Sequence, residues 1–116
     1  MDNQAYLGTW TAYFKAWSSV SPAERETLVS GSAYQNCVYT DPTSECRGHS
    51  ELIYRMERSQ QQYPGAYFNN EKLICHHARG LFSWTMDDAA GSVLTPGWSF
   101  ARFNAVGRLV QMSGFF

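Results

Sequence analysis

The hydrophobic residues at the start of the chain recur at helical intervals. Four aromatic residues follow one another at steps of four, three and four: Tyr6, Trp10, Tyr13 and Trp17. This spacing places them on one face of an amphipathic helix over residues 4–17. An aromatic face of this kind is typical of core packing, although Tyr13 and Trp17 each carry a polar atom that needs a partner when it is buried.

Two more helices are expected before residue 65. Ser21-Pro22-Ala23-Glu24 combines a serine N-cap, a proline at the first helical position and a glutamate at the third, and this helix should end near Gly31. A third helix fits residues 49–62. Its inner side carries Leu52, Ile53 and Met56, and its outer side carries Glu51, Arg55, Glu57 and Arg58.

Strand patterns dominate the rest of the chain. A short strand should end at Asp41, and four more are predicted at residues 67–77, 81–87, 93–104 and 109–116. The turns between these four, at 78–80, 87–91 and 105–107, are short enough for hairpins, so the sheet should be antiparallel there. Helices followed by a run of strands indicate an α+β domain with the helices on one face of the sheet.

Composition narrows the possible partners. The 116 residues should form one domain, residues 1–116, and 44% of them are hydrophobic. A formal net charge of -1 without charge runs argues against nucleic acid. No segment approaches the roughly 20 apolar residues of a membrane span, and no signal peptide is visible, so we expect a cytoplasmic protein without a membrane partner. Three cysteines without C-x-x-C spacing favour reduced thiols.

The segment Tyr39-Thr40-Asp41-Pro42 places a carboxylate at the end of an apolar strand. If Asp41 faces a pocket there, desolvation should raise its pKa from about 3.9 toward the range of a general base. Asp41→Asn would then leave the melting temperature nearly unchanged or raise it. The alternative is that Asp41 caps the turn at residues 42–44, as aspartate often does.

Other polar and aromatic residues add weaker signals. His76 and His77 are adjacent, so on a strand they should point to opposite faces and cannot share a metal ion. We expect no metal and no cofactor. One histidine could enter a cavity and relay protons, although a histidine bonded to backbone near a hairpin is the commoner arrangement. Phe82 and Trp84 share a strand face and could line a pocket for a flat apolar ligand or simply pack in the core.

Several motifs, taken in order, resemble the SnoaL-like branch of the nuclear transport factor 2-like superfamily, which includes polyketide cyclases and ketosteroid isomerases. The motifs are residues 39–42, Gly48 before the third helix, His76-His77 with Phe82-Ser83-Trp84, Gly97, and residues 103–109 leading to Gly114-Phe115-Phe116. The resemblance covers essentially the whole chain. It implies a cystatin-like cone, in which a strongly curved, mostly antiparallel sheet carries three helices on its concave face around an apolar cavity.

The resemblance also implies roles for single residues. Asp41 matches the catalytic base of the steroid isomerases, and Tyr13 matches the tyrosine that stabilises the oxyanion, with Trp10 or Trp17 taking its place if the register shifts by one turn. Ser99 stands where those enzymes carry a protonated aspartate, and a serine is a weaker donor. The residues expected to bind the substrate are Trp17, Tyr39, His76, Phe82, Trp84, Ser99, Phe103 and Met112.

Two functions therefore stay open at the level of sequence. The protein could bind a small apolar or aromatic ligand and transfer a proton next to its carbonyl group, with Asp41 as the base. It could also be a non-catalytic module that binds a ligand or a protein, because Asp87 and Asp88 fall in a predicted turn and no second buried acid is evident. The family and the large apolar residues of the late strands favour a homodimer.

Overall fold

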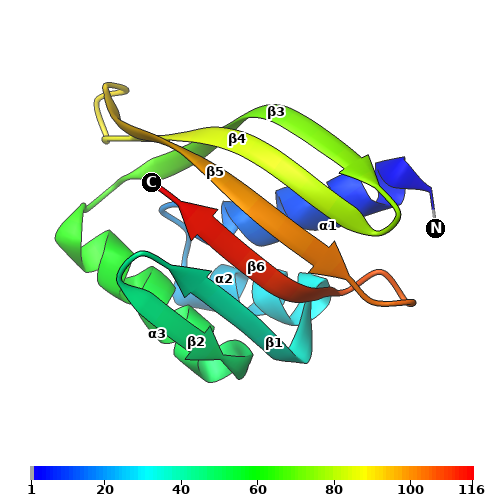
Figure 1. Ribbon diagram of the computed structural model, residues 1–116. Helices are drawn as coiled ribbons and strands as arrows, with labels where there is room; N and C mark the ends of the chain where they lie inside the picture. Colours follow the sequence, from blue (N-terminus) through cyan, green and yellow to red (C-terminus); the bar gives the residue numbers. More distant parts are fainter. Residues whose placement is uncertain (1) are drawn as a thin grey trace.

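The computed structural model describes residues 2–116, which form three helices and one six-stranded sheet (Figure 1). The elements are α1 (Asn3–Lys15), α2 (Pro22–Ser32), β1 (Ala33–Asp41), β2 (Ser44–Arg47), α3 (Gly48–Gln62), β3 (Tyr67–His76), β4 (Arg79–Asp87), β5 (Val93–Phe103) and β6 (Leu109–Phe115). The strand order is β2-β1-β6-β5-β4-β3. Every neighbouring pair is antiparallel except β1 and β6, which are parallel.

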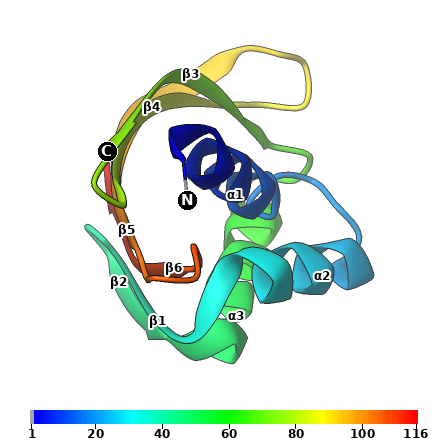
Figure 2. The ribbon, with the colours of Figure 1, turned by 90° about the vertical axis from the view of Figure 1, so that its right-hand side faces the viewer.

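The sheet is strongly curved and wraps around α1, while α2 and α3 lie on its open side (Figure 2). This arrangement confirms the predicted α+β class with three helices against the concave face of a mostly antiparallel sheet. No helix within residues 2–116 has both the length and the apolar character needed to cross a membrane.

The aromatic stripe of α1 fixes this helix against the sheet. Tyr6, Trp10 and Tyr13 are buried as predicted, and the Trp10 ring stacks on Phe82 of β4 with ring centroids 4.2 Å apart. The helix ends at Lys15, two residues before the predicted end. Burial of this stripe is what positions the Tyr13 hydroxyl on the concave side of the sheet.

The segment between α1 and α2 is held by a buried arginine that the sequence analysis did not single out. Arg25 of α2 donates through Nε to the carbonyl oxygen of Ala16 at 2.9 Å, and through Nη2 to those of Ser18 and Val20. Carbonyls near the C-terminal end of a helix lack partners within the helix, so these bonds stabilise the chain where it leaves α1. They fix the position of Trp17, which lies between the helices.

Strand β2 is the element that the sequence analysis missed. It pairs antiparallel with β1, with Asp41 opposite Ser44, and only Cys46 among its four residues is buried. A four-residue strand with one inward side chain shows no readable alternation of apolar and polar residues. The hairpin places Asp41 next to a tight turn, in reach of donors from both strands.

Candidate functional site

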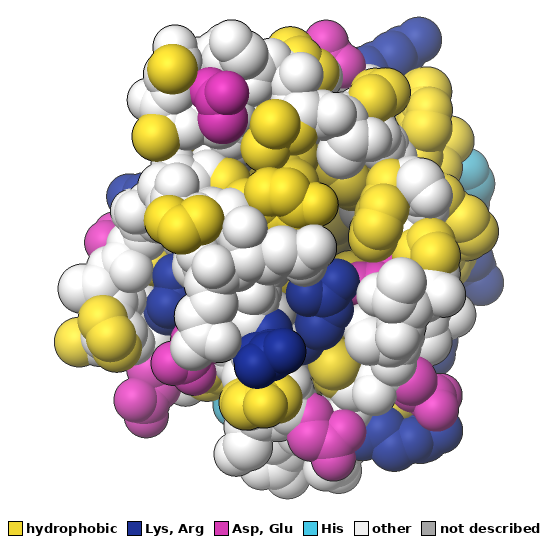
Figure 3. Space-filling view, turned by 90° about the vertical axis from the view of Figure 1, so that its left-hand side faces the viewer, with side chains coloured by type: hydrophobic (Ala, Val, Ile, Leu, Met, Phe, Trp, Pro, Cys, Tyr) yellow, Lys and Arg dark blue, Asp and Glu magenta, His cyan; other side chains and the backbone are white. Residues whose placement is uncertain are grey.

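A cavity of about 410 Å³ opens at the end of the sheet where the β1–β2 turn and the C-terminus lie. Viewed from that end, hydrophobic side chains surround a hollow and basic side chains lie beside it (Figure 3). Nine of the nineteen residues in its wall are aromatic. The polar side chains besides the tyrosines and tryptophans are Asp41, Thr43, Arg55, Ser59, Gln62, Thr95 and Ser99. Such a hollow suits a small ligand with a flat apolar body and few polar groups.

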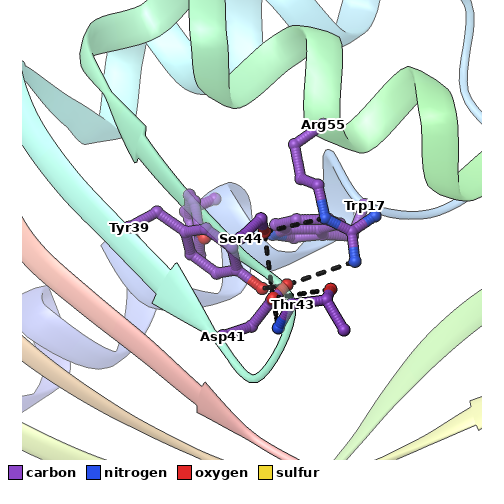
Figure 4. A network of polar contacts seen from close by, with 7 residues as sticks. Trp17, Tyr39, Asp41, Thr43, Ser44 and Arg55 are labelled. Atoms are coloured by element: carbon purple, nitrogen blue, oxygen red, sulfur yellow. Dashed lines mark hydrogen bonds and ion pairs between the residues drawn. The ribbon is translucent and has the colours of Figure 1, made fainter.

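Asp41 sits in this wall with no exposed side-chain surface and with five hydrogen bonds (Figure 4). Its Oδ2 atom accepts from the Tyr39 hydroxyl at 2.7 Å and from Nη2 of Arg55 at 3.2 Å. Its Oδ1 atom accepts from the backbone N–H of Thr43 at 2.9 Å, the Thr43 hydroxyl at 3.1 Å and the Ser44 hydroxyl at 2.9 Å. Asp41 therefore both lines the cavity and caps the turn, so the two readings of its role are compatible.

This network reverses the predicted shift of the Asp41 pKa. Burial raises the pKa of Asp41, but the hydrogen bonds from Tyr39, Thr43 and Ser44, together with the charge of Arg55, outweigh burial and hold the pKa below its ordinary value. The prediction of a raised pKa was wrong, because it counted desolvation and no donors. At neutral pH the carboxylate is ionised and its lone pairs are largely occupied.

Arg55 is a cavity residue that we predicted on the outside of its helix. Its Nε donates to the Ser44 hydroxyl at 3.0 Å, its guanidinium carbon lies 6.0 Å from the Trp17 ring centroid, and 23% of its side chain is exposed. The spacing could have revealed it, because Arg55 lies three residues after Leu52 and four before Ser59, both of which are buried. A charged residue in an otherwise inward row was the available signal.

Two buried indole groups fix the orientation of two hydroxyls in the wall. Nε1 of Trp17 donates to the Tyr13 hydroxyl at 3.0 Å, and Nε1 of Trp84 donates to Oγ of Ser99 at 2.9 Å. An indole N–H can only donate, so each hydroxyl oxygen accepts that bond and its own proton points elsewhere. Within residues 2–116, no group lies in position to accept a hydrogen bond from the Tyr13 or the Ser99 hydroxyl. Burial raises the pKa of Tyr13, so this hydroxyl keeps its proton at neutral pH.

The structure brings together most of the predicted site residues but not all of them. Those in the cavity wall are Tyr13, Trp17, Tyr39, Asp41, Trp84, Ser99 and Met112. His76, Phe82 and Phe103 do not line it, contrary to the expectation that they would face the same cavity. Phe82 is buried beneath Trp10, Phe103 packs on the Tyr6 ring with centroids 4.8 Å apart, and His76 is exposed at the far end of β3.

The two adjacent histidines lie side by side at the surface. Their Nδ1 atoms are 3.1 Å apart, which contradicts the prediction of opposite faces. The reason is that His77 is not in the strand: with a φ of 47° it begins the two-residue turn to β4 together with Ala78, whose φ is 58°. Strand alternation does not apply to a residue in this left-handed conformation.

Asp87 was predicted both as the last residue of a strand over 81–87 and as part of a turn with Asp88. It is the last residue of β4, as the strand prediction had it, and it is buried. Its Oδ2 accepts from the Asn69 side-chain amide at 2.7 Å, and its Oδ1 has no hydrogen-bond partner within the described residues. Because Asp87 is not part of the cavity wall, Asp41 is the only carboxylate that residues 2–116 contribute to it.

No family model and no curated protein matches this chain. Solved structures do. A SnoaL-like family protein from Agrobacterium tumefaciens, a proposed isomerase, is 25% identical, with a TM-score of 0.89 and 97% of each chain covered. A proposed polyketide cyclase from Sinorhizobium meliloti is 12% identical, with a TM-score of 0.75, and the match covers 92% of this chain and 93% of the cyclase.

A third structure, from Catenulispora acidiphila, has a ketosteroid isomerase-like fold and contains trimethylamine. It is 13% identical to this chain, with a TM-score of 0.74, and the match covers 93% of this chain and 84% of the other. The two more distant structures share the fold alone. The Agrobacterium protein confirms the predicted resemblance to the SnoaL-like branch, and all three structures confirm the curved α+β fold.

Proposed function

We propose that this chain uses its SnoaL-like fold to bind a flat, mostly apolar small molecule that carries a carbonyl oxygen. The observation that carries the proposal is the pair of oriented hydroxyls, Tyr13 and Ser99, in the wall of an aromatic cavity. Aromatic walls favour a flat apolar body. Two donors without protein acceptors favour an oxygen that only accepts, as a carbonyl oxygen does.

The hydroxyls make this preference selective. A buried donor left without an acceptor costs about 1–3 kcal/mol, so a ligand that satisfies both hydroxyls gains over a hydrocarbon of the same shape. An alcohol is also disfavoured, because its own O–H would face two groups that already donate. We therefore expect 2-acetylnaphthalene to bind more tightly than the alcohol obtained by reducing its ketone group, measured by titration calorimetry. Equal affinities for the two would contradict the proposal.

Replacing Trp84 by phenylalanine should weaken this selectivity. Without the indole N–H, both lone pairs of the Ser99 oxygen are open and its hydroxyl can turn, so it accepts more readily from the alcohol. We expect the ratio of alcohol to ketone dissociation constants to fall by about three- to tenfold, the value of one neutral hydrogen bond. Lost packing would weaken the binding of both probes and leave the ratio of their dissociation constants unchanged, so the ratio isolates the effect of the hydrogen bond. Trp98→Phe is the control, because Trp98 is 47% exposed outside the cavity.

A second candidate function is proton transfer next to the carbonyl, with Asp41 as the base. It is favoured by an ionised, desolvated carboxylate in the same wall. Both Asp41 oxygens already accept hydrogen bonds, so a substrate would have to displace one donor. Thr43 is the donor to displace, because it is exposed and supplies two of the five hydrogen bonds. Exchange of the methyl protons of 2-acetylnaphthalene for deuterium, followed by NMR, tests this function. If the exchange is no faster than in buffer, proton transfer is refuted and only the binding function remains.

We also propose that two copies associate through the outer face of the sheet. Large apolar side chains are exposed there in two cross-strand pairs, Ile74 opposite Leu81 and Trp98 opposite Phe115. An exposed apolar surface of this kind is typical of an interface. Light scattering should give twice the chain mass, and Trp98→Glu should give the monomer. A monomeric wild-type protein at micromolar concentration would refute the dimer.

A further inference from the structure

Helix α3 turns two polar side chains toward the cavity. Arg55 and Ser59 are four residues apart, so they lie one above the other on the same helical face, and both are part of the cavity wall. Ser59 is buried. Within residues 2–116, no side chain or carbonyl group accepts a hydrogen bond from its hydroxyl. The same wall therefore offers a cation and a hydroxyl side by side.

Arg55 has donors to spare. A guanidinium carries five N–H groups, and the structure uses one from Nε, to Ser44, and one from Nη2, to Asp41. Within residues 2–116, Nη1 has no acceptor. Figure 4 shows these two bonds and the Trp17 ring near the guanidinium, contacts that together favour one orientation of the group. A donor group held in place in advance loses little entropy when a ligand binds.

The negative charge of Asp41 does not depend on Arg55 alone. Tyr39, Thr43 and Ser44 donate the other four of its five hydrogen bonds. Arg55 can therefore be shared with a second anion, as guanidinium groups often are. A singly charged group fits better than a dianion here, because each added negative charge is repelled by Asp41.

We propose that Arg55 and Ser59 form a carboxylate-binding site, so that the ligand is a flat aromatic acid. The inference rests on the proposed function, since it adds an anionic group to the apolar ligand of the same cavity. The carboxylate would accept from the Arg55 guanidinium and from the Ser59 hydroxyl, while Tyr13 and Ser99 remain available to an uncharged oxygen elsewhere on the molecule.

Titration calorimetry at pH 7 with three probes tests this site: 2-naphthoate, its methyl ester and 2-acetylnaphthalene. We expect the wild-type protein to bind 2-naphthoate at least tenfold more tightly than the ester, because a charge-assisted bond to arginine is about twice as strong as a neutral one. Arg55→Met should remove this preference, so that the dissociation constants of the acid and the ester come within about threefold of each other. Arg55→Lys, which keeps the charge but loses the planar fork, should retain part of it.

The control is Arg58→Met, on the same helix but exposed and outside the cavity wall, which should bind all three probes as the wild type does. Circular dichroism establishes that each variant is folded. If Arg55→Met does not fold, Arg55→Lys decides the question. An Arg55→Lys protein that prefers 2-naphthoate over the ester as strongly as the wild type does overturns the site. Ester and acid binding equally to the wild type refutes the carboxylate site alone. Failure of all three probes to bind refutes the proposed function as well.

Discussion

Asp41→Asn is expected to lower the free energy of unfolding by about 2–4 kcal/mol at pH 7. This is somewhat less than the cost of removing one partner from a fully buried ion pair, because the Arg55 side chain is 23% exposed. The amide loses the charge that Arg55 faces, and its NH2 group can only donate. It would therefore oppose the donors of Tyr39, Thr43 or Ser44, all of which point at the carboxylate. The sequence alone led to the opposite expectation, an unchanged or raised melting temperature.

The pH dependence gives this prediction a second readout. The pKa of Asp41 is lower in the folded protein than in the unfolded chain, where it is about 3.9. The unfolded state therefore binds the proton first on acidification. The stabilisation by the carboxylate is fully present above the unfolded pKa and is lost as the pH falls through the folded pKa. The difference in stability between wild type and Asp41→Asn should shrink accordingly.

Urea denaturation of both proteins at pH 7, 4 and 3 measures this effect. Glu57→Gln is the control, because Glu57 is exposed on the same helix as Arg55, and its substitution should change stability by no more than about 0.5 kcal/mol. A stable Asp41→Asn protein with the same acid sensitivity as the wild type would mean that the five hydrogen bonds contribute nothing net.

The helices and long strands could be predicted because their patterns are long. The α1 stripe and the Ser21 cap each rest on several consecutive positions, and both were confirmed. Strand β2 was too short for its pattern to be read, and the inward position of Arg55 was missed as a consequence. Arginine is assigned to solvent by default, and its burial makes sense only with Asp41 and Ser44, which the unrecognised β1–β2 hairpin brings beneath α3.

The site could be located from the sequence but not characterised. The motif at residues 39–42 predicted that Asp41 would face a pocket, and Asp41 does line the cavity, whereas the direction of its pKa shift depends on which donors the fold supplies. The cavity walls show the same limit. Alternation placed Trp84 and Phe82 on one face of β4, yet only Trp84 reaches the cavity, because the Trp10 ring covers Phe82. Helix packing across the sheet decided this difference.

Gly97→Ala is expected to destabilise the protein by displacing Trp84, which lies across from Gly97 in the β4–β5 pair. A Cβ at residue 97 would overlap the Cη2 and Cζ2 atoms of the Trp84 ring and lie 2.7 Å from Cε2. Moving the ring aside would break its contacts. It packs on Phe14 and Phe68, with centroids 5.7 and 5.5 Å away, and its Nε1 is bonded to Ser99.

Inserting one methyl group into such packing costs about 1–3 kcal/mol, which denaturant titration of Gly97→Ala should detect. Because displacing the indole also weakens its bond to Ser99, the preference for ketone over alcohol should fall, as is expected for Trp84→Phe. Gly8→Ala is the matched control: Gly8 is exposed in α1 with nothing within 4 Å of an added Cβ, so the same substitution there should stabilise the helix by about 0.5–1 kcal/mol. If both variants gained stability, the contact between Trp84 and the backbone of β5 would not constrain the cavity wall, and the orientation of the Ser99 hydroxyl would need another cause.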